Sequence, residues 1–338
     1  MSKFLQKYIP KISRRVRLPY FIWQSVLDKK NTFYAISQER RFEHDEYSYD
    51  SQYENELDFS SGEGLTILLK KYDVPKNGTL LEIGCGTGVL SAGLVKPNYF
   101  SKYLITDPSS AFLEISKTKL TKAGLDLTNT DFAILNADDM ISLPKSMFSV
   151  IAIRATLHHI LDVEKFIKYS AKALSRNGVL VFQEPCREGY ILMGAMAQFL
   201  PLVLEKKSIK LTEKQKYSIQ IFIDTMKYYS RTDLDKTLAE DKHLFKVDEI
   251  MRITEKYNLK TDFYANMNFE DFSKNKTVIE KDHFSIFYFN YLKYYMSFDD
   301  ELMSYFREYF AEYISFLEDI SGNNNCPYLD GVFVCQKK

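Results

Sequence analysis

The stretch that decides the fold runs from Thr79 to Val95 and reads TLLEIGCGTGVLSAGLV. Its first five residues are mostly apolar and predict a short buried strand of a parallel sheet, with Glu82 near the end. Three glycines follow at alternate positions, and the last seven residues have helical character. A strand, a glycine turn and a helix together leave bare backbone against which a ligand can lie. A glycine-rich turn that binds nothing is the alternative.

The spacing of the glycines separates two kinds of nucleotide site. A dinucleotide-binding turn has the pattern G-x-G-x-x-G, in which the third glycine comes one residue later than here. This chain has E-x-G-x-G-x-G from Glu82 to Gly88. That pattern resembles the first motif of the class I S-adenosylmethionine (SAM)-dependent methyltransferases, and the likeness in the order of elements covers residues 75–186 well and 245–265 weakly.

Strands and helices alternate after the glycine turn, which is typical of a parallel sheet covered on both faces. The pattern predicts four more strands before the alternation stops at Cys186, at residues 103–106, 132–135, 148–153 and 179–182. Residues 259–265 and 331–335 are expected to form a sixth and a seventh strand. The predicted fold class is therefore α/β: a doubly wound, mostly parallel, seven-stranded, Rossmann-like sheet with an added helical cap.

The same patterns divide the chain into a core and its additions. Residues 302–320 carry apolar side chains at amphipathic-helix spacing within an aromatic-rich stretch. These aromatic residues are expected either to wall an acceptor pocket or to form the core of the helical cap. The predicted organisation is an N-terminal helical region covering the site (1–73), the α/β core (74–186), a helical cap insertion (187–242), a continuation of the core (243–266), an aromatic-rich helical insertion (267–328) and a last core strand (329–338).

The resemblance implies a set of cosubstrate-binding residues. Gly84, Gly86 and Gly88 would let the backbone approach the methionine portion and ribose of SAM, and Glu82 would hold the turn or reach the amino group. Asp107 ends the second strand where the family places an acid on the ribose hydroxyls, because an ionised carboxylate can accept from two vicinal hydroxyls. A helix cap is its alternative role. Further residues expected in the site are Cys85, Pro108, Ala137, Asp138 and Arg154.

Asp138 matches the acid that contacts the adenine amine in this family, and Asp139 is an equally near neighbour. We favour Asp138, although a loop acid that caps a short helix remains the alternative. Arg154 could pair with the cosubstrate carboxylate or with an anionic acceptor, or lie at the edge of the core. Tyr47, Tyr49 and Tyr53 are expected to close over the cosubstrate or to pack against the cap.

Candidate catalytic residues follow the fourth and fifth strands. His158 and His159 come just after residues 148–153, and Glu184 ends the fifth strand. A base is needed only if the acceptor must lose a proton, and imidazole titrates in the suitable range. The alternatives are a histidine satisfied by backbone at the start of a helix and a glutamate that caps a helix.

The amino-acid composition limits the kinds of partner that the chain is expected to bind. The chain has 338 residues with 45 basic and 45 acidic side chains, so no overall field attracts nucleic acid or an anionic membrane. The first 30 residues are locally basic, and a solvated helix face is favoured over contact with a membrane surface. Four scattered cysteines, with no C-x-x-C and no histidine at ligand spacing, predict neither a metal site nor a disulfide framework. The sequence has no apparent signal peptide or membrane span, and a cytoplasmic location is expected.

The resulting hypothesis is a SAM-dependent methyltransferase that releases S-adenosyl-L-homocysteine. We expect a small or medium-sized organic acceptor, methylated at oxygen by in-line displacement. Two alternatives stay open: an RNA or protein methyltransferase, and a non-catalytic partner subunit with this fold. The neutral charge disfavours nucleic acid as a substrate.

Overall fold

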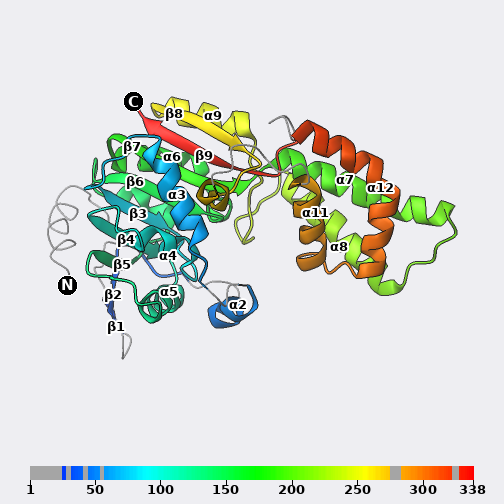
Figure 1. Cartoon of the computed structure of the whole chain (residues 1–338), viewed down its shortest axis with the longest axis horizontal. Coiled ribbons are helices and arrows are strands. Elements are labelled where there is room, and N and C mark those ends of the chain that lie inside the picture. The colour runs from blue at the N-terminus through cyan, green and yellow to red at the C-terminus, as the bar shows by residue number, and fades with distance from the viewer. Residues whose placement is uncertain (1–24, 28–31, 41–44, 54–56, 275–282, 322–326) are drawn as a thin grey trace.

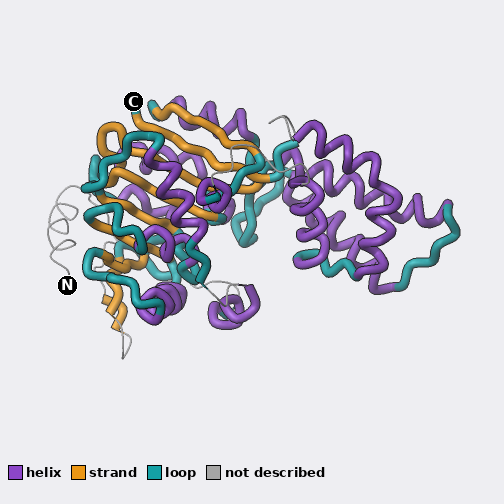
Figure 2. Tube along the Cα trace, viewed as in Figure 1, coloured by secondary structure: helices purple, strands orange, loops and turns teal. Residues whose placement is uncertain are grey.

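The computed structural model describes residues 25–27, 32–40, 45–53, 57–274, 283–321 and 327–338. Most of the locally basic N-terminus, and with it the question of membrane contact, lies outside these ranges. The described chain forms an α/β unit built on one sheet and, beside it, a lobe made only of helices (Figures 1 and 2). Within the described residues, no helix has the length and apolar character required to cross a membrane.

The sheet has the strand order β1-β2-β5-β4-β3-β6-β7-β9-β8. Its seven predicted strands are present: β3 (Thr79–Ile83), β4 (Lys102–Asp107), β5 (Thr130–Ile134), β6 (Phe148–Arg154), β7 (Leu174–Pro185), β8 (Leu259–Ala265) and β9 (Asp330–Lys337). Strands β3 to β7 run parallel, and β9 enters antiparallel between β7 and β8. The predicted doubly wound α/β class is confirmed.

Two strands were not expected. β1 (Ser25–Leu27) and β2 (Thr32–Ala35) extend the sheet beyond β5, where Tyr34 pairs with Ala133. The described sheet therefore has nine strands instead of seven, and residues 1–73 are not purely helical. Runs of three and four residues are too short to show alternation, so only their pairing with β5 reveals them.

Apolar side chains on both faces of the central strands explain why the sheet is covered twice. Leu80 and Val150 contribute to one buried cluster, whereas their neighbours Leu81 and Ile151 contribute to the other. Successive side chains of a strand point to opposite faces, so a strand that is apolar throughout must be covered on both. The first face packs on α3 (Ser60–Lys70), α4 (Val89–Val95), α5 (Ser110–Lys122) and α10 (Phe269–Ser273), and the second on α6 (Val163–Ala173) and α9 (Val247–Lys256).

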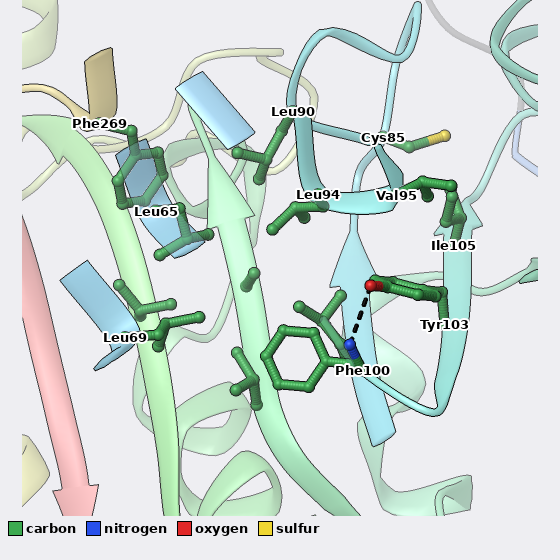
Figure 3. Close-up of a cluster of buried hydrophobic side chains, with 14 of the residues drawn as sticks. Leu65, Leu69, Cys85, Leu90, Leu94, Val95, Phe100, Tyr103, Ile105 and Phe269 are labelled. Atoms are coloured by element: carbon green, nitrogen blue, oxygen red, sulfur yellow. Dashed lines mark hydrogen bonds between the residues drawn. The ribbon is translucent and has the colours of Figure 1, made fainter. Parts of the chain in front are cut away.

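Figure 3 shows the first of these clusters, between the sheet and the helices that cover it. Tyr103 is buried there, and its hydroxyl accepts a hydrogen bond of 3.0 Å from the backbone N–H of Phe100 (Figure 3). Phe269, from the start of the stretch expected to be a separate insertion, reaches the same cluster against Leu65 of α3 (Figure 3). The first part of the 267–328 region therefore belongs to the α/β unit.

The helical lobe consists of α7 (Arg187–Lys206), α8 (Glu213–Ser230), α11 (His283–Tyr294) and α12 (Asp300–Ser321). It has its own apolar core, in which Phe222, Phe284, Tyr288 and Phe306 are fully buried. Among the described residues, none of the aromatic side chains of α11 lines the cavity described below. Most of the aromatic stretch therefore forms the core of the lobe, which was one of the two predictions made for it.

Candidate functional site

The glycine turn lies at the point where the strand order of the sheet reverses. β3 is central, with β4 on one side and β6 on the other, and such switch points of open α/β sheets hold ligands at the carboxyl ends of the strands. Gly84, Gly86 and Gly88 all have positive φ angles, of 68°, 49° and 93°. Side chains rarely tolerate these values, so the turn requires glycine.

A cavity of about 220 Å³ opens above this turn. Nine of the ten residues predicted to bind the cosubstrate line it: Glu82, Gly84, Cys85, Gly86, Asp107, Pro108, Ala137, Asp138 and Arg154. Gly88 is not among the lining residues and occupies the N-cap position of α4. Asp139, the alternative to Asp138, is not among the lining residues. A Cβ built on Gly86 would meet no protein atom within 4 Å, so at this position the backbone faces open space.

Asp107 is held at the end of β4 by the turn itself. Its Oδ2 accepts from the backbone N–H of Gly86 at 3.0 Å, and its Oδ1 accepts from that of Ser109 at 2.9 Å. Burial raises the pKa of Asp107 to about 7, although both hydrogen bonds act in the opposite direction. Each carboxylate oxygen has a second lone pair, so a pair of ligand hydroxyls can be accepted as well.

Glu82 lies one strand away and is equally buried. Its Oε2 accepts a hydrogen bond of 2.7 Å from the hydroxyl of Ser91 in α4, which ties the end of β3 to the helix after the turn. Burial raises the pKa of Glu82 to about 7, and the charge of Arg154 partly opposes this. Two buried acids and one arginine therefore surround the glycine turn.

An aromatic pair and a short helix close one side of the cavity. Tyr49, on α2 (Glu46–Tyr53), and Phe112, on α5, both line it, and their rings meet edge to face at 5.9 Å. Glu46 of the same helix accepts a hydrogen bond of 2.7 Å from the hydroxyl of Ser109. Tyr47 is 53% exposed, and the side chain of Tyr53 lies outside the described residues. Of the three predicted tyrosines, the structure thus places Tyr49 at the cavity.

The three predicted catalytic residues lie together but differ in their access to the cavity. Only His159 lines it. Glu184 is buried, and its Oε1 accepts from the backbone N–H groups of Thr156 and Leu157 at 2.9 and 2.6 Å. Its Oε2 lies 2.6 Å from Nδ1 of His158. These contacts make Glu184 an anchor for the short helix η2 (Leu157–His159) that carries both histidines.

His158 is not placed to accept a proton from an acceptor. Burial alone would lower its pKa, but the carboxylates of Glu184 and Asp241 outweigh this and raise the pKa to about 10. Asp241 Oδ1 lies 3.4 Å from Nε2 of His158 and 3.2 Å from Nδ1 of His159. The imidazole of His158 is therefore held as a cation near neutral pH in this arrangement, so the contacts indicate a positioning role.

Asp241 belongs to the segment 231–246, which connects α8 to α9 and passes over the histidines. The backbone N–H of Lys242 donates to the carbonyl of His158 at 2.8 Å, and His243 Nε2 lies 2.9 Å from the carbonyl of Ile160. The hydroxyl of Tyr229, near the end of α8, donates to Asp241 Oδ2 at 2.7 Å. Two residues of this segment, Glu240 and Lys242, line the cavity.

Several site residues carry no signal that sequence reading could have used. Tyr229, Asp241 and Lys242 come from the end of a helix and an irregular segment, and nothing near them in sequence marks them as site residues. Arg40 lines the cavity because its backbone N–H donates to the carbonyl of Pro108, a contact between distant segments. Only the folded chain brings these groups together.

Comparison with known proteins agrees with the fold. Residues 81–180 match the family described as "Methyltransferase domain". A ubiquinone biosynthesis O-methyltransferase from Pelagibacter ubique (strain HTCC1062) is 30% identical over 113 residues, which are 33% of this chain and 44% of that protein. The uncharacterized methyltransferase YcgJ of Bacillus subtilis (strain 168) is 25% identical over 126 residues, 37% of this chain and 48% of that protein. This chain thus spans about half the length of these two curated relatives.

Among solved structures, a putative sarcosine dimethylglycine methyltransferase from Galdieria sulphuraria superposes with a TM-score of 0.48 at 15% identity. The superposition covers 82% of this chain and 85% of that one.

Proposed function

We propose that this chain, which belongs to the class I SAM-dependent methyltransferases, transfers the sulfonium methyl of SAM to an oxygen atom of a small or medium-sized organic acceptor. One observation carries the proposal: the glycine turn, Asp107 and Asp138 converge on one cavity at the switch point of the sheet. The relative that methylates oxygen in ubiquinone biosynthesis is consistent with an oxygen acceptor.

The residues around the cavity fit the parts of SAM by their chemistry. The open space at Gly86 admits a ligand against bare backbone. The Asp107 carboxylate, fixed by two backbone N–H groups, suits the two vicinal hydroxyls of a ribose. Asp138 also lines the cavity and suits the exocyclic amine of adenine, while Tyr49 and Phe112 offer an aromatic edge in the same cavity. Arg154 would pair with the carboxylate of the methionine portion.

When bound, SAM supplies an electrophilic methyl group on a positively charged sulfur. The protein has to align the acceptor with the carbon–sulfur bond and exclude water, and orientation of this kind contributes on the order of 7–11 kcal/mol. The 231–246 segment provides the exclusion, because Glu240 and Lys242 form part of the cavity wall. His159 is the predicted catalytic residue that lines the cavity, so we place the acceptor hydroxyl next to its imidazole.

Calorimetry with purified protein tests cosubstrate binding. SAM and S-adenosyl-L-homocysteine should each bind at one site per chain, and Asp138→Ala should weaken both. Asp139→Ala is the matched control, because the neighbouring acid lies outside the cavity lining and its removal should leave affinity unchanged. Loss of one charge-assisted hydrogen bond corresponds to roughly 1.5–3 kcal/mol, or about 10- to 150-fold. Absence of binding heat in the wild-type protein would refute the proposal and favour the partner-subunit alternative.

Methyl transfer from labelled SAM tests the acceptor class. A panel of phenols and other hydroxyl compounds should accept label, whereas amines and thiols of matched size should accept less. Label transferred to RNA or to added protein would overturn the small-molecule assignment. In that case nucleic acid should also copurify and be released by raised salt.

A further inference from the structure

Two neighbouring histidines and a distant aspartate meet at one point beside the cavity. Nε2 of His158 and Nδ1 of His159 lie 3.4 and 3.2 Å from the same oxygen, Oδ1 of Asp241. One potential ligand atom from each of the three residues lies within 4.8 Å of those of the other two. All three side chains are partly exposed, at 15%, 32% and 41%, so solvent can reach the point where they meet.

These separations suit the ligands of a metal ion. For a tetrahedral ion with ligand bonds near 2.0–2.1 Å, neighbouring ligand atoms are roughly 3.3 Å apart. The two separations from Asp241 Oδ1 bracket this value. No separation among the three ligand atoms exceeds 4.8 Å, and Nδ1 of His159, which also lies 3.1 Å from the carbonyl oxygen of Glu240, would exchange that contact for the ion. Asp241 sits on a connecting segment instead of a strand or helix.

A supporting shell of hydrogen bonds orients two of the three side chains. Glu184 holds Nδ1 of His158 at 2.6 Å and so directs Nε2 toward Asp241. Carboxylate–histidine–metal arrangements of this kind are common, because the carboxylate fixes the ring and raises its basicity. The hydroxyl of Tyr229 donates to Oδ2 of Asp241 at 2.7 Å, which leaves Oδ1 for the centre of the cluster.

The charges favour a cation at the same place. Glu184 and Asp241 put carboxylates at both nitrogens of one imidazole. A divalent cation bound there would contact the Asp241 carboxylate directly and the Glu184 carboxylate through the ring of His158.

We propose that His158, His159 and Asp241 bind one divalent transition-metal ion of the Zn²⁺ class beside the cavity. Imidazole nitrogens with one carboxylate oxygen are ligands that suit zinc and its neighbours, whereas Mg²⁺ and Ca²⁺ prefer oxygen alone. Three protein ligands leave a fourth position open, as in zinc sites that act on a substrate. Metal binding goes beyond the proposed function. Its catalytic consequence, an increased acidity of the acceptor hydroxyl, rests on that function.

Untagged protein, stripped with a chelator and dialysed, should be titrated with Zn²⁺ in a calorimeter and with Co²⁺ in a spectrophotometer. We expect one Zn²⁺ per chain and visible absorption typical of a low-coordinate Co²⁺ site. Asp241→Asn should weaken Zn²⁺ binding by more than about tenfold, and Glu184→Gln by about 10–100-fold, the usual effect of removing a supporting partner. His243→Gln is the matched control: it changes a histidine of the same segment that lies outside the cluster, and binding should stay within about twofold.

Several outcomes would overturn this proposal. They are an absence of Zn²⁺ and Co²⁺ binding to the wild-type protein, equal affinities for wild type and Asp241→Asn, and a thiolate charge-transfer band that indicates a cysteine site. SAM calorimetry on the same samples separates the two proposals. Unchanged SAM binding without Zn²⁺ binding refutes only the metal site, whereas loss of SAM binding from the wild-type protein refutes the proposed function. Circular dichroism identifies a variant that has not folded, and His159→Gln then replaces it.

Discussion

The two ends of the cavity are built in different ways. Most of the end proposed to hold the cosubstrate comes from residues 82–138, in which Glu82 and Asp107 lie in β3 and β4 and Gly86 and Asp138 come after β3 and β5. The acceptor end combines η2, the end of β7 and the 231–246 segment, which meet only through tertiary contacts. Under the proposed function, a local motif therefore determines where SAM would bind, whereas the packing of an insertion determines what would surround the acceptor.

The largest expected effect concerns the acceptor end. Glu184→Ala removes a buried carboxylate that accepts from two backbone N–H groups and faces His158. Removing one partner of a buried, hydrogen-bonded pair costs about 3–5 kcal/mol of unfolding free energy. Chemical denaturation of the apo protein measures this loss. Glu164→Ala is the control, because its ion pair with Lys256 is exposed and should contribute little.

If Glu184→Ala were as stable as the control, the acceptor end would not depend on this tertiary network. The contrast between the two ends would then disappear.

A smaller effect, with opposite signs for stability and binding, is expected at the cosubstrate end. Burial raises the pKa of Asp107 from 3.8 to about 7, so the folded apo protein binds a proton that the unfolded chain releases. The stabilisation from this proton is complete below the unfolded pKa and is lost as pH rises toward 7. Asp107→Asn should therefore be more stable than wild type at pH 8, yet bind SAM more weakly. Thermal unfolding at pH 5 and pH 8, with calorimetry at pH 8, measures both changes.

Glu82 has the same sign of shift and stays in place, so Asp107→Asn should reduce the pH dependence without abolishing it. A variant that is less stable than wild type at pH 8 would show that the hydrogen bonds to Gly86 and Ser109 outweigh the cost of the buried charge.

The contrast between the two ends of the cavity also explains which parts of the structure could be predicted from the sequence. The seven strands that continue the glycine motif could be predicted because fully apolar or alternating runs, ended by polar residues, reflect burial that each strand experiences locally. Most of the residues predicted to bind the cosubstrate sit at the ends of those strands, so they could be predicted together with the strands. Strands β1 and β2 could not, because they are short and form only against β5.

Acceptor-end residues were only partly predictable, for the same physical reason. His158, His159 and Glu184 follow predicted strands, so their position was expected, but their burial and access were not. Asp241 contacts both histidines because the 231–246 segment is hydrogen-bonded to η2 and β7, and Tyr229 in turn contacts Asp241. No local sequence pattern encodes a contact between residues so far apart in the chain. The prediction that the chain has no metal site therefore could not take Asp241 into account.

The smallest expected effect separates two roles of Gly86, which are to allow a left-handed backbone and to let the cosubstrate approach that backbone. Gly86 and Gly124 have positive φ angles of 49° and 73°, and an added Cβ meets no protein atom within 4 Å at either position. Alanine should cost roughly 1–2 kcal/mol of unfolding free energy at both, because only the left-handed backbone is penalised. Gly86 lines the cavity and Gly124 does not, so SAM affinity should fall in Gly86→Ala alone. Denaturation and calorimetry on the pair measure the two quantities separately. Equal SAM affinities would mean that the turn supports the strand and helix without approaching the cosubstrate, and the local motif would then mark the fold but not the binding site.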